Sequence, residues 1–181
     1  MDAIRVIRFI VTTVAWAKDW DDRISGRQCQ WCSHGRPDEI DFGTRVFAGQ
    51  VSDAYFARRA FVRGYAVVVW RGRHVVEPID LSPAEADQYQ REVLTVARAI
   101  RDHFQPAKLN YLTMGNWEPH LHTHVTARYP DDPGDGGPLP AKTPPLLDLR
   151  QWRTDAEAVR TLLEQIQWHA SGALLHPDGH G

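Results

Sequence analysis

Hydrophobic positions mark one long amphipathic helix in the middle of the chain. Ser82, Pro83 and Glu85 have the spacing of a helix N-terminus with a capping box, and Pro106 marks the end of the helix. Between these signals, apolar side chains recur at helical spacing, namely at Tyr89, Val93, Val96, Ala97, Ile100 and Phe104. The pattern predicts a long helix that packs one face against a core.

Shorter apolar runs on both sides of this helix predict strands. The continuous run Tyr65–Trp70 is typical of a buried strand, and a turn is expected at residues 49–53. Four more strands are expected at residues 45–48, 54–57, 109–114 and 121–127. The sequence therefore predicts an α+β domain with an antiparallel sheet of about five strands and a long helix packed on it.

The first 25 residues form a segment of their own. Apolar residues at helical spacing predict a short amphipathic helix, with one face made of Ile4, Ile7, Val11, Val14 and Ala15. An alternative is a secretory signal, because Phe9–Ala17 is an apolar run, but Arg8 comes directly before it. A mostly charged break follows at residues 18–23.

The rest of the chain divides into a main domain and a C-terminal part. Residues 26–133 hold the predicted sheet and long helix, with a loop-like stretch at 26–43. Residues 134–181 begin in a loop rich in proline and glycine, spanning about 130–145, and continue into a helix at 154–167. A loose tail is expected at the C-terminus.

Composition limits the classes of partner. The chain has 181 residues, of which 43% are hydrophobic, so one domain with a real core is expected. A net charge of −2 predicts no general attraction to nucleic acid or to an anionic membrane. No stretch reaches the ~20 apolar residues of a membrane span, and a cytoplasmic location is expected.

Three histidines at alternate positions give the chain its strongest chemical signal. His120, His122 and His124 lie in a predicted strand, so their side chains should point to the same face of the sheet. Imidazoles gathered in this way can bind metal, transfer protons or act as nucleophiles. The alternative is a polar, solvent-facing strand that happens to contain three histidines.

This region resembles the histidine triad family of nucleotide-binding proteins, whose signature is His-x-His-x-His followed by apolar residues and often an arginine, here Arg128. The match includes Asn110, the Gly115–Asn116 pair and Pro119. It extends less sharply over residues 27–133, because a Cys-x-x-Cys pair and a Gly-Arg-His segment occur in the order seen in some bacterial members. The resemblance implies a HIT-like fold.

The resemblance also implies roles for the site residues. In the family the middle histidine is the nucleophile, which puts this role on His122. His124 would contact the phosphate, and its cationic form would offset negative charge. Asn110 and Asn116 would bind the substrate, although Asn116 could equally be a turn residue that caps its own backbone.

The two cysteines suggest a second site. Cys29 and Cys32 have the two-residue spacer of zinc sites, which is also compatible with a disulfide or a redox pair. Zinc-bearing relatives use such a pair, a histidine after the buried strand and the first triad histidine, which implies a structural Zn²⁺ on Cys29, Cys32, His74 and His120. His34 is the rival fourth ligand. A free dithiol, as in a thiol-disulfide protein, is the alternative.

Taken together, the expected function is hydrolysis or transfer at the α-phosphate of a nucleoside phosphoramidate or dinucleoside polyphosphate, through a covalent nucleotidyl-histidine. The alternative is a zinc-stabilised nucleotide-binding or interaction protein without catalysis. Thr123 and Thr126 replace the commoner apolar residues of the motif, so the choice of substrate stays open. Relatives are often homodimers, and a homodimer is therefore the expected assembly.

Overall fold

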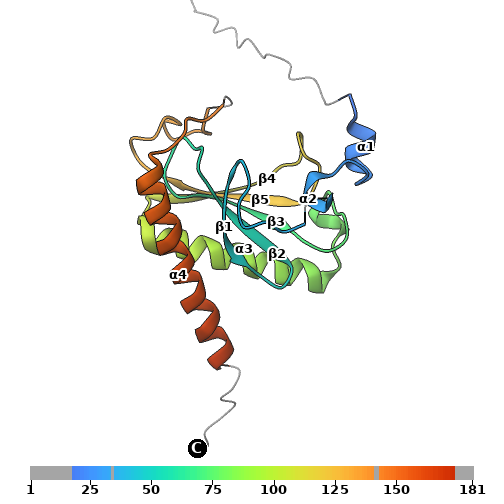
Figure 1. The fold of residues 1–181 in the computed structure, drawn as a ribbon. Coiled ribbons are helices and arrows are strands. Elements are labelled where there is room, and N and C mark those ends of the chain that lie inside the picture. The colour runs from blue at the N-terminus through green and yellow to red at the C-terminus, as the bar shows by residue number, and fades with distance from the viewer. Residues whose placement is uncertain (1–17, 34, 141–142, 174–181) are drawn as a thin grey trace, which may run out of the picture.

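The computed structural model describes residues 18–33, 35–140 and 143–173. The helix predicted near the N-terminus and the last residues of the predicted C-terminal tail lie outside this part of the chain. Within it, an antiparallel sheet carries two long helices on one of its faces (Figure 1). Among the described residues, no helix combines the length and apolar character that a membrane span requires.

The sheet has five antiparallel strands in the order β1-β2-β3-β5-β4. The strands are β1 (Gly43–Ala48), β2 (Ser52–Ala57), β3 (Tyr65–Trp70), β4 (Lys108–Thr113) and β5 (His122–Arg128). The first three strands form a meander, and β5 inserts between β3 and β4. The last strand in the chain is therefore an inner strand of the sheet, which puts the triad region between two neighbours. The α+β prediction is confirmed.

The predicted long helix is α3, which spans Pro83–Phe104. Its capping box is formed, because Glu85 N–H donates to Ser82 Oγ and Ser82 N–H donates to Glu85 Oε2. Gln105 ends the helix in the left-handed conformation, with φ of 46°, directly before Pro106. The buried face of α3 consists of Tyr89, Glu92, Val93, Val96, Ala97, Ala99 and Ile100.

The C-terminal helix α4 (Leu149–Ala173) is longer than the predicted 154–167. It begins earlier because Asp148 caps it: Asp148 Oδ1 accepts hydrogen bonds from the backbone N–H of Arg150 at 3.1 Å and of Gln151 at 2.9 Å. Four apolar residues along one side of α4 enter the same core as α3, namely Trp152, Ala156, Val159 and Leu163.

The opposite face of the sheet is partly covered by the N-terminal segment. The predicted charged break at 18–23 is instead helical, with α1 at Trp20–Ile24, and a second short helix, α2 (Gln30–Ser33), follows. The ring of Trp31 lies 5.6 Å from the ring of Tyr55 on β2. Ile40 and Phe42 pack on the same small cluster as Trp31. This second face carries the triad.

Candidate active site and metal centre

Strand β5 places two of the three histidines on the second face of the sheet. His122 is opposite Val69 and His124 is opposite Val67, both on β3. His120 is different, because β5 begins only at His122. The prediction of one strand carrying all three histidines is therefore wrong for His120, which lies buried in the bend before the strand.

His122 is held in one tautomer by the backbone. Its Nδ1 lies 2.6 Å from the carbonyl oxygen of His120. A carbonyl can only accept, so Nδ1–H donates and Nε2 keeps its lone pair. Burial lowers the pKa of His122, and the hydrogen bond to His120 opposes this shift in part. The ring is therefore neutral at pH 7, the state in which its Nε2 is nucleophilic.

His124 is ordered by Tyr65, a residue that the sequence analysis did not single out. Tyr65 Oη lies 2.6 Å from His124 Nδ1, and the two rings stack with centroids 5.7 Å apart. Burial raises the pKa of Tyr65 to about 12, so the phenol keeps its proton and is able to donate it to Nδ1. In that arrangement the proton of the neutral His124 ring lies on Nε2.

The surroundings of His124 lower its tendency to carry charge. Burial, together with the neighbouring His122 ring, lowers the pKa of His124 to about 4. The ring is therefore neutral at pH 7 in the ligand-free protein, and the expected cationic form in the presence of phosphate stays a prediction. It can still donate a hydrogen bond from Nε2 to a phosphate oxygen, and a bound anion would favour its protonation.

Four residues from distant parts of the chain form a second cluster. Cys29, Cys32, His74 and His120 each offer one ligand atom, and these atoms all lie within 4.8 Å of one another. Cys29 directly precedes α2 and Cys32 lies within it, while His74 lies in the connection from β3 to α3. His120 comes from the bend before β5 and so links this cluster to the strand of His122.

The distances within the cluster fit a tetrahedral zinc site. Cys29 Sγ lies 3.3 Å from His120 Nδ1, and Cys32 Sγ lies 3.4 Å from His74 Nδ1 and 3.5 Å from His120 Nδ1. Zinc bonds of about 2.3 Å to sulfur and about 2.0–2.1 Å to nitrogen imply a tetrahedral S···N edge of roughly 3.5 Å. The four side chains are thus spaced as zinc ligands.

The tautomers of both histidines also suit a metal. His120 Nε2 donates to Trp70 O at 2.8 Å, and His74 Nε2 donates to Ile24 O at 3.1 Å. Each Nδ1 therefore keeps a lone pair that faces the sulfur atoms, and backbone partners of this kind orient metal-binding histidines. The rival ligand His34 lies outside the described residues.

The other predicted site residues are more spread out. Asn110 lies on β4, opposite Thr126 of β5. Its Oδ1 accepts a hydrogen bond from Arg128 Nη1 at 2.6 Å. Asn116 is exposed in the loop between β4 and β5. The structure thus places Asn110 near the triad face with its amide oxygen already engaged, while the substrate-binding role of both asparagines stays a prediction.

Comparison with known proteins gives a consistent picture. The family model of the HIT domain matches residues 45–131. A histidine triad protein from Bradyrhizobium japonicum superposes with a TM-score of 0.61 at 28% identity, covering 70% of this chain and 91% of that one. A search of curated proteins gives no match.

Two further solved structures share the fold. A histidine triad protein from Marinobacter aquaeolei has a TM-score of 0.62 at 22% identity and covers 68% of this chain and 90% of its own. A zinc-bound histidine triad family protein from Mycobacterium smegmatis has a TM-score of 0.57 at 20% identity, covering 79% of this chain and 98% of its own.

Proposed function

Residues 45–131 of this chain form a HIT domain, the domain of the histidine triad family, and from this premise we propose that the protein is a nucleotidyl hydrolase or transferase. The substrate is a nucleoside phosphoramidate or a dinucleoside polyphosphate. The observation that carries the proposal is the hydrogen bond from His122 Nδ1 to His120 O, because it leaves His122 Nε2 with a free lone pair.

In the first step, His122 Nε2 attacks the α-phosphorus and forms a P–N bond. The bond from phosphorus to the leaving group breaks, and the leaving group departs with the bonding electron pair. An amine leaving group also takes up a proton from the solvent, so that it departs as the neutral amine. With Tyr65 Oη as the donor to Nδ1, His124 Nε2–H donates to a phosphoryl oxygen or to the leaving group and stabilises the charge that develops there.

In the second step, a water molecule attacks the same phosphorus, forms a P–O bond and releases one proton to the solvent. The P–N bond breaks, its electron pair returns to His122 Nε2, and a nucleoside monophosphate leaves. A transferase would use phosphate or an amine as the acceptor in place of water. The two variants share the covalent intermediate, so one trapping experiment serves both.

The cysteine–histidine cluster is proposed to bind one structural Zn²⁺. Four protein ligands leave no open position, so the metal would stabilise the fold and would not polarise the substrate. The M. smegmatis relative carries bound zinc according to its description, which supports this assignment. Thiolate ligands also need a reducing compartment, which supports a cytoplasmic location.

The proposal is tested by trapping the intermediate. Protein is mixed with a nucleoside phosphoramidate or dinucleoside polyphosphate labelled at the α-phosphorus, and label bound to protein is measured after denaturation. Wild type should trap label and turn over. His122→Asn should do neither, while its nucleotide affinity stays within about tenfold of wild type, because the ring attacks phosphorus without being the main anchor.

His103→Asn is the matched control, because His103 lies on α3, which covers the sheet face opposite to His122, and its Nε2 lies 3.1 Å from Asp155 Oδ1. It should keep full labelling. If His122→Asn retained more than roughly a tenth of the wild-type kcat, the nucleophile assignment would be wrong. Tight nucleotide binding by wild type with no turnover and no label would instead support the non-catalytic nucleotide-binding alternative.

A homodimer is also proposed, and its interface is the free side of β4. This strand is at the end of the sheet order, and large apolar side chains are exposed along it and just after it at Tyr111, Leu112 and Met114. Unpaired strand edges of this kind readily pair with another chain. Light scattering should give twice the chain mass for wild type, and Leu112→Lys should shift the mass towards that of one chain.

A further inference from the structure

A cavity of about 530 Å³ lies beside the triad on the same face of the sheet. Asp53, Tyr55 and Val69 contribute to its lining from β2 and β3, and Trp31 closes one side. The proposed reaction steps use none of these residues. The question is therefore which ligand this cavity suits.

The sheet register connects the cavity to His122. Asp53 is the cross-strand partner of Val69, and Val69 is the cross-strand partner of His122. Cross-strand partners share a face, so the three side chains form one row across three strands. With strands about 4.7–4.9 Å apart, Asp53 lies roughly 9–10 Å from His122. A polyphosphate chain that begins at His122 can extend along this row towards Asp53.

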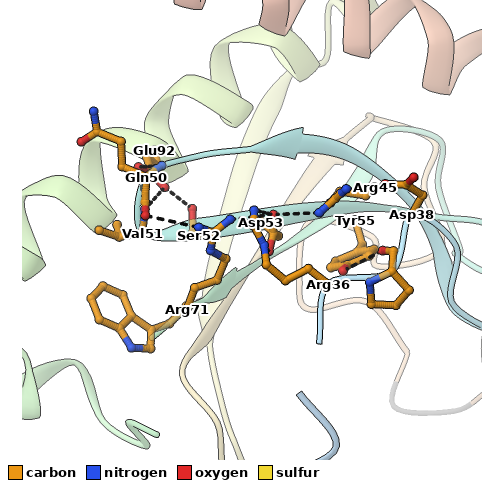
Figure 2. A network of polar contacts seen from close by, with 12 residues as sticks. Arg36, Asp38, Arg45, Gln50, Val51, Ser52, Asp53, Tyr55, Arg71 and Glu92 are labelled. Atoms are coloured by element: carbon orange, nitrogen blue, oxygen red, sulfur yellow. Dashed lines mark hydrogen bonds and ion pairs between the residues drawn. The ribbon is translucent and has the colours of Figure 1, made fainter. Parts of the chain in front are cut away.

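Positive charge dominates the polar part of the cavity. Figure 2 shows Arg36, Arg45 and Arg71 converging on the carboxylate of Asp53. Arg36 Nε lies 2.5 Å, Arg71 Nη1 3.3 Å and Arg45 Nη1 3.7 Å from the nearest Asp53 oxygen. Asp38 forms an ion pair with Arg45. The buried carboxylate of Asp53 is then left to balance the two positive charges of Arg36 and Arg71.

The remaining charges near the cavity do not remove this surplus. Arg73 also lines it, but Arg73 is paired with Glu85 at 2.9 Å. Arg71 Nη2 makes one further contact, to Gln50 O at 3.4 Å. Arg36 and Arg71 therefore remain as guanidinium groups with donors to spare, and such groups bind phosphate and carboxylate oxygens well.

The arginines are not needed to hold the neighbouring turn. Glu92 on α3 holds the β1–β2 turn from the other face of the sheet, where its carboxylate accepts from Ser52 Oγ at 2.5 Å, Gln50 N at 2.8 Å and Val51 N at 3.1 Å (Figure 2). Glu92 thus anchors the turn, to which the Arg71 side chain adds only the 3.4 Å contact with Gln50 O, and Arg36 and Arg71 keep donors for a ligand.

We propose that this cavity binds a second anionic group of the substrate, beyond the phosphate attacked by His122, and that Arg36 and Arg71 hold it. The ligand class is a phosphate or polyphosphate group carried by a nucleotide. The inference rests on the proposed function, since it takes the α-phosphate to lie at His122. The inference adds that the protein prefers substrates that place an anionic group in this cavity over substrates that place a neutral group there.

The test compares the binding of AMP and ADP, which differ by one phosphate. Calorimetry is done on the full zinc-loaded chain carrying His122→Asn, so that no turnover interferes. The background protein should bind ADP about tenfold more tightly than AMP, as expected for a charge-assisted contact to one added phosphate. Adding Arg71→Met should remove this preference and leave the affinity for AMP unchanged.

Two further variants separate binding from folding. Asp53→Asn removes the resident negative charge, so it should strengthen ADP binding, an effect that a purely structural ion pair would not produce. Arg101→Met is the matched control, since Arg101 lies on α3 beside Asp102 and should change neither affinity. If Arg71→Met lowers the melting temperature, Arg36→Lys keeps the charge, loses the forked geometry and should weaken ADP binding selectively.

Each outcome separates this inference from the proposed function. Equal affinities for AMP and ADP, or an equal loss of both in Arg71→Met, would overturn the second anion site and leave the role of His122 untouched. Weaker ADP binding in Asp53→Asn would also overturn it. Failure of both nucleotides to bind would contradict the proposed function itself, and the anion site would fall with it.

Discussion

The hydroxyl of Tyr65 is hydrogen-bonded to one of the two ring nitrogens of His124. This oxygen lies 2.6 Å from His124 Nδ1, in a place where burial keeps the phenol protonated. We expect the hydroxyl to donate to Nδ1, which places the proton of His124 on Nε2. The half-buried Tyr65 at the start of β3 would then be a positioning group for His124.

Tyr65→Phe should lower kcat about tenfold with little change in KM, because one net hydrogen bond of roughly 1 kcal/mol no longer selects the tautomer. Nitrogen NMR of the imidazole rings should show mixed tautomers for His124. Tyr129→Phe is the matched control, since Tyr129 Oη donates to Arg63 O instead. This variant should keep the wild-type kcat and KM. An unchanged kcat in Tyr65→Phe would remove the positioning role.

At the scale of elements, the end of β5 is secured by an ion pair within a turn. Arg128 Nε lies 2.6 Å from Asp132 Oδ2, and both side chains are buried. Asp132 also accepts from Tyr129 N at 3.1 Å and from Gly134 N at 2.9 Å. This turn joins β5 to the proline-rich loop, so its stability should follow the ionisation of Asp132.

The hydrogen bond from Arg128 is the main cause that holds the pKa of Asp132 well below its ordinary value of 3.8. The folded state therefore binds this proton less readily than the unfolded state. The resulting stability is present above about pH 4 and is lost as the pH falls from there towards the folded pKa.

Asp132→Asn should lower the free energy of unfolding at pH 7 by about 3 kcal/mol, because it leaves a buried guanidinium without its carboxylate. It should also flatten the loss of stability in acid. Denaturant unfolding between about pH 3 and pH 7 measures both effects. Asp131→Asn, at an exposed neighbour, should behave as wild type. An acid dependence equal to wild type in Asp132→Asn would contradict this assignment.

At the scale of the whole molecule, the cysteine–histidine cluster joins three separate regions. Cys29 and Cys32 come from the N-terminal segment, His74 from the β3–α3 connection and His120 from the approach to β5. A metal bound here would clamp the N-terminal segment to the sheet. Because the unfolded chain has no preformed site, the binding free energy would add directly to folding stability.

His120→Ala should therefore lose most of its zinc and melt roughly 5–10 °C lower, with activity falling as a consequence. His122→Ala should keep about one zinc per chain and a wild-type melting temperature, and lose its chemistry. Atomic emission and thermal unfolding measure the two properties, and chelation of wild type should reproduce the lower melting temperature. Equal zinc loss in both variants, or none in either, would show that the triad is divided wrongly.

Local signals account for most of the predicted elements. The apolar period of α3 and its capping box depend on residues a few positions apart, so the sequence contains the whole signal. The same is true of β3, whose bounds match the prediction. The apolar pattern from Thr154 onward predicts only the later part of α4, whereas its first turn depends on the Asp148 cap. Helix α1 has few apolar residues and therefore gives no periodic signal.

The sequence by itself determined that His122 and His124 share one face, because strand side chains alternate with a fixed period of two. The grouping of His120 with Cys29, which is 91 positions away, was implied by the family resemblance, and the structure brings the two side chains together. Only the tertiary structure decided that Tyr65 contacts His124 across 59 positions. The convergence of Arg36 and Arg71 on Asp53 is equally invisible in the sequence. Alternation acts along one strand, whereas these contacts depend on strand order and register, which the packing of the whole core selects.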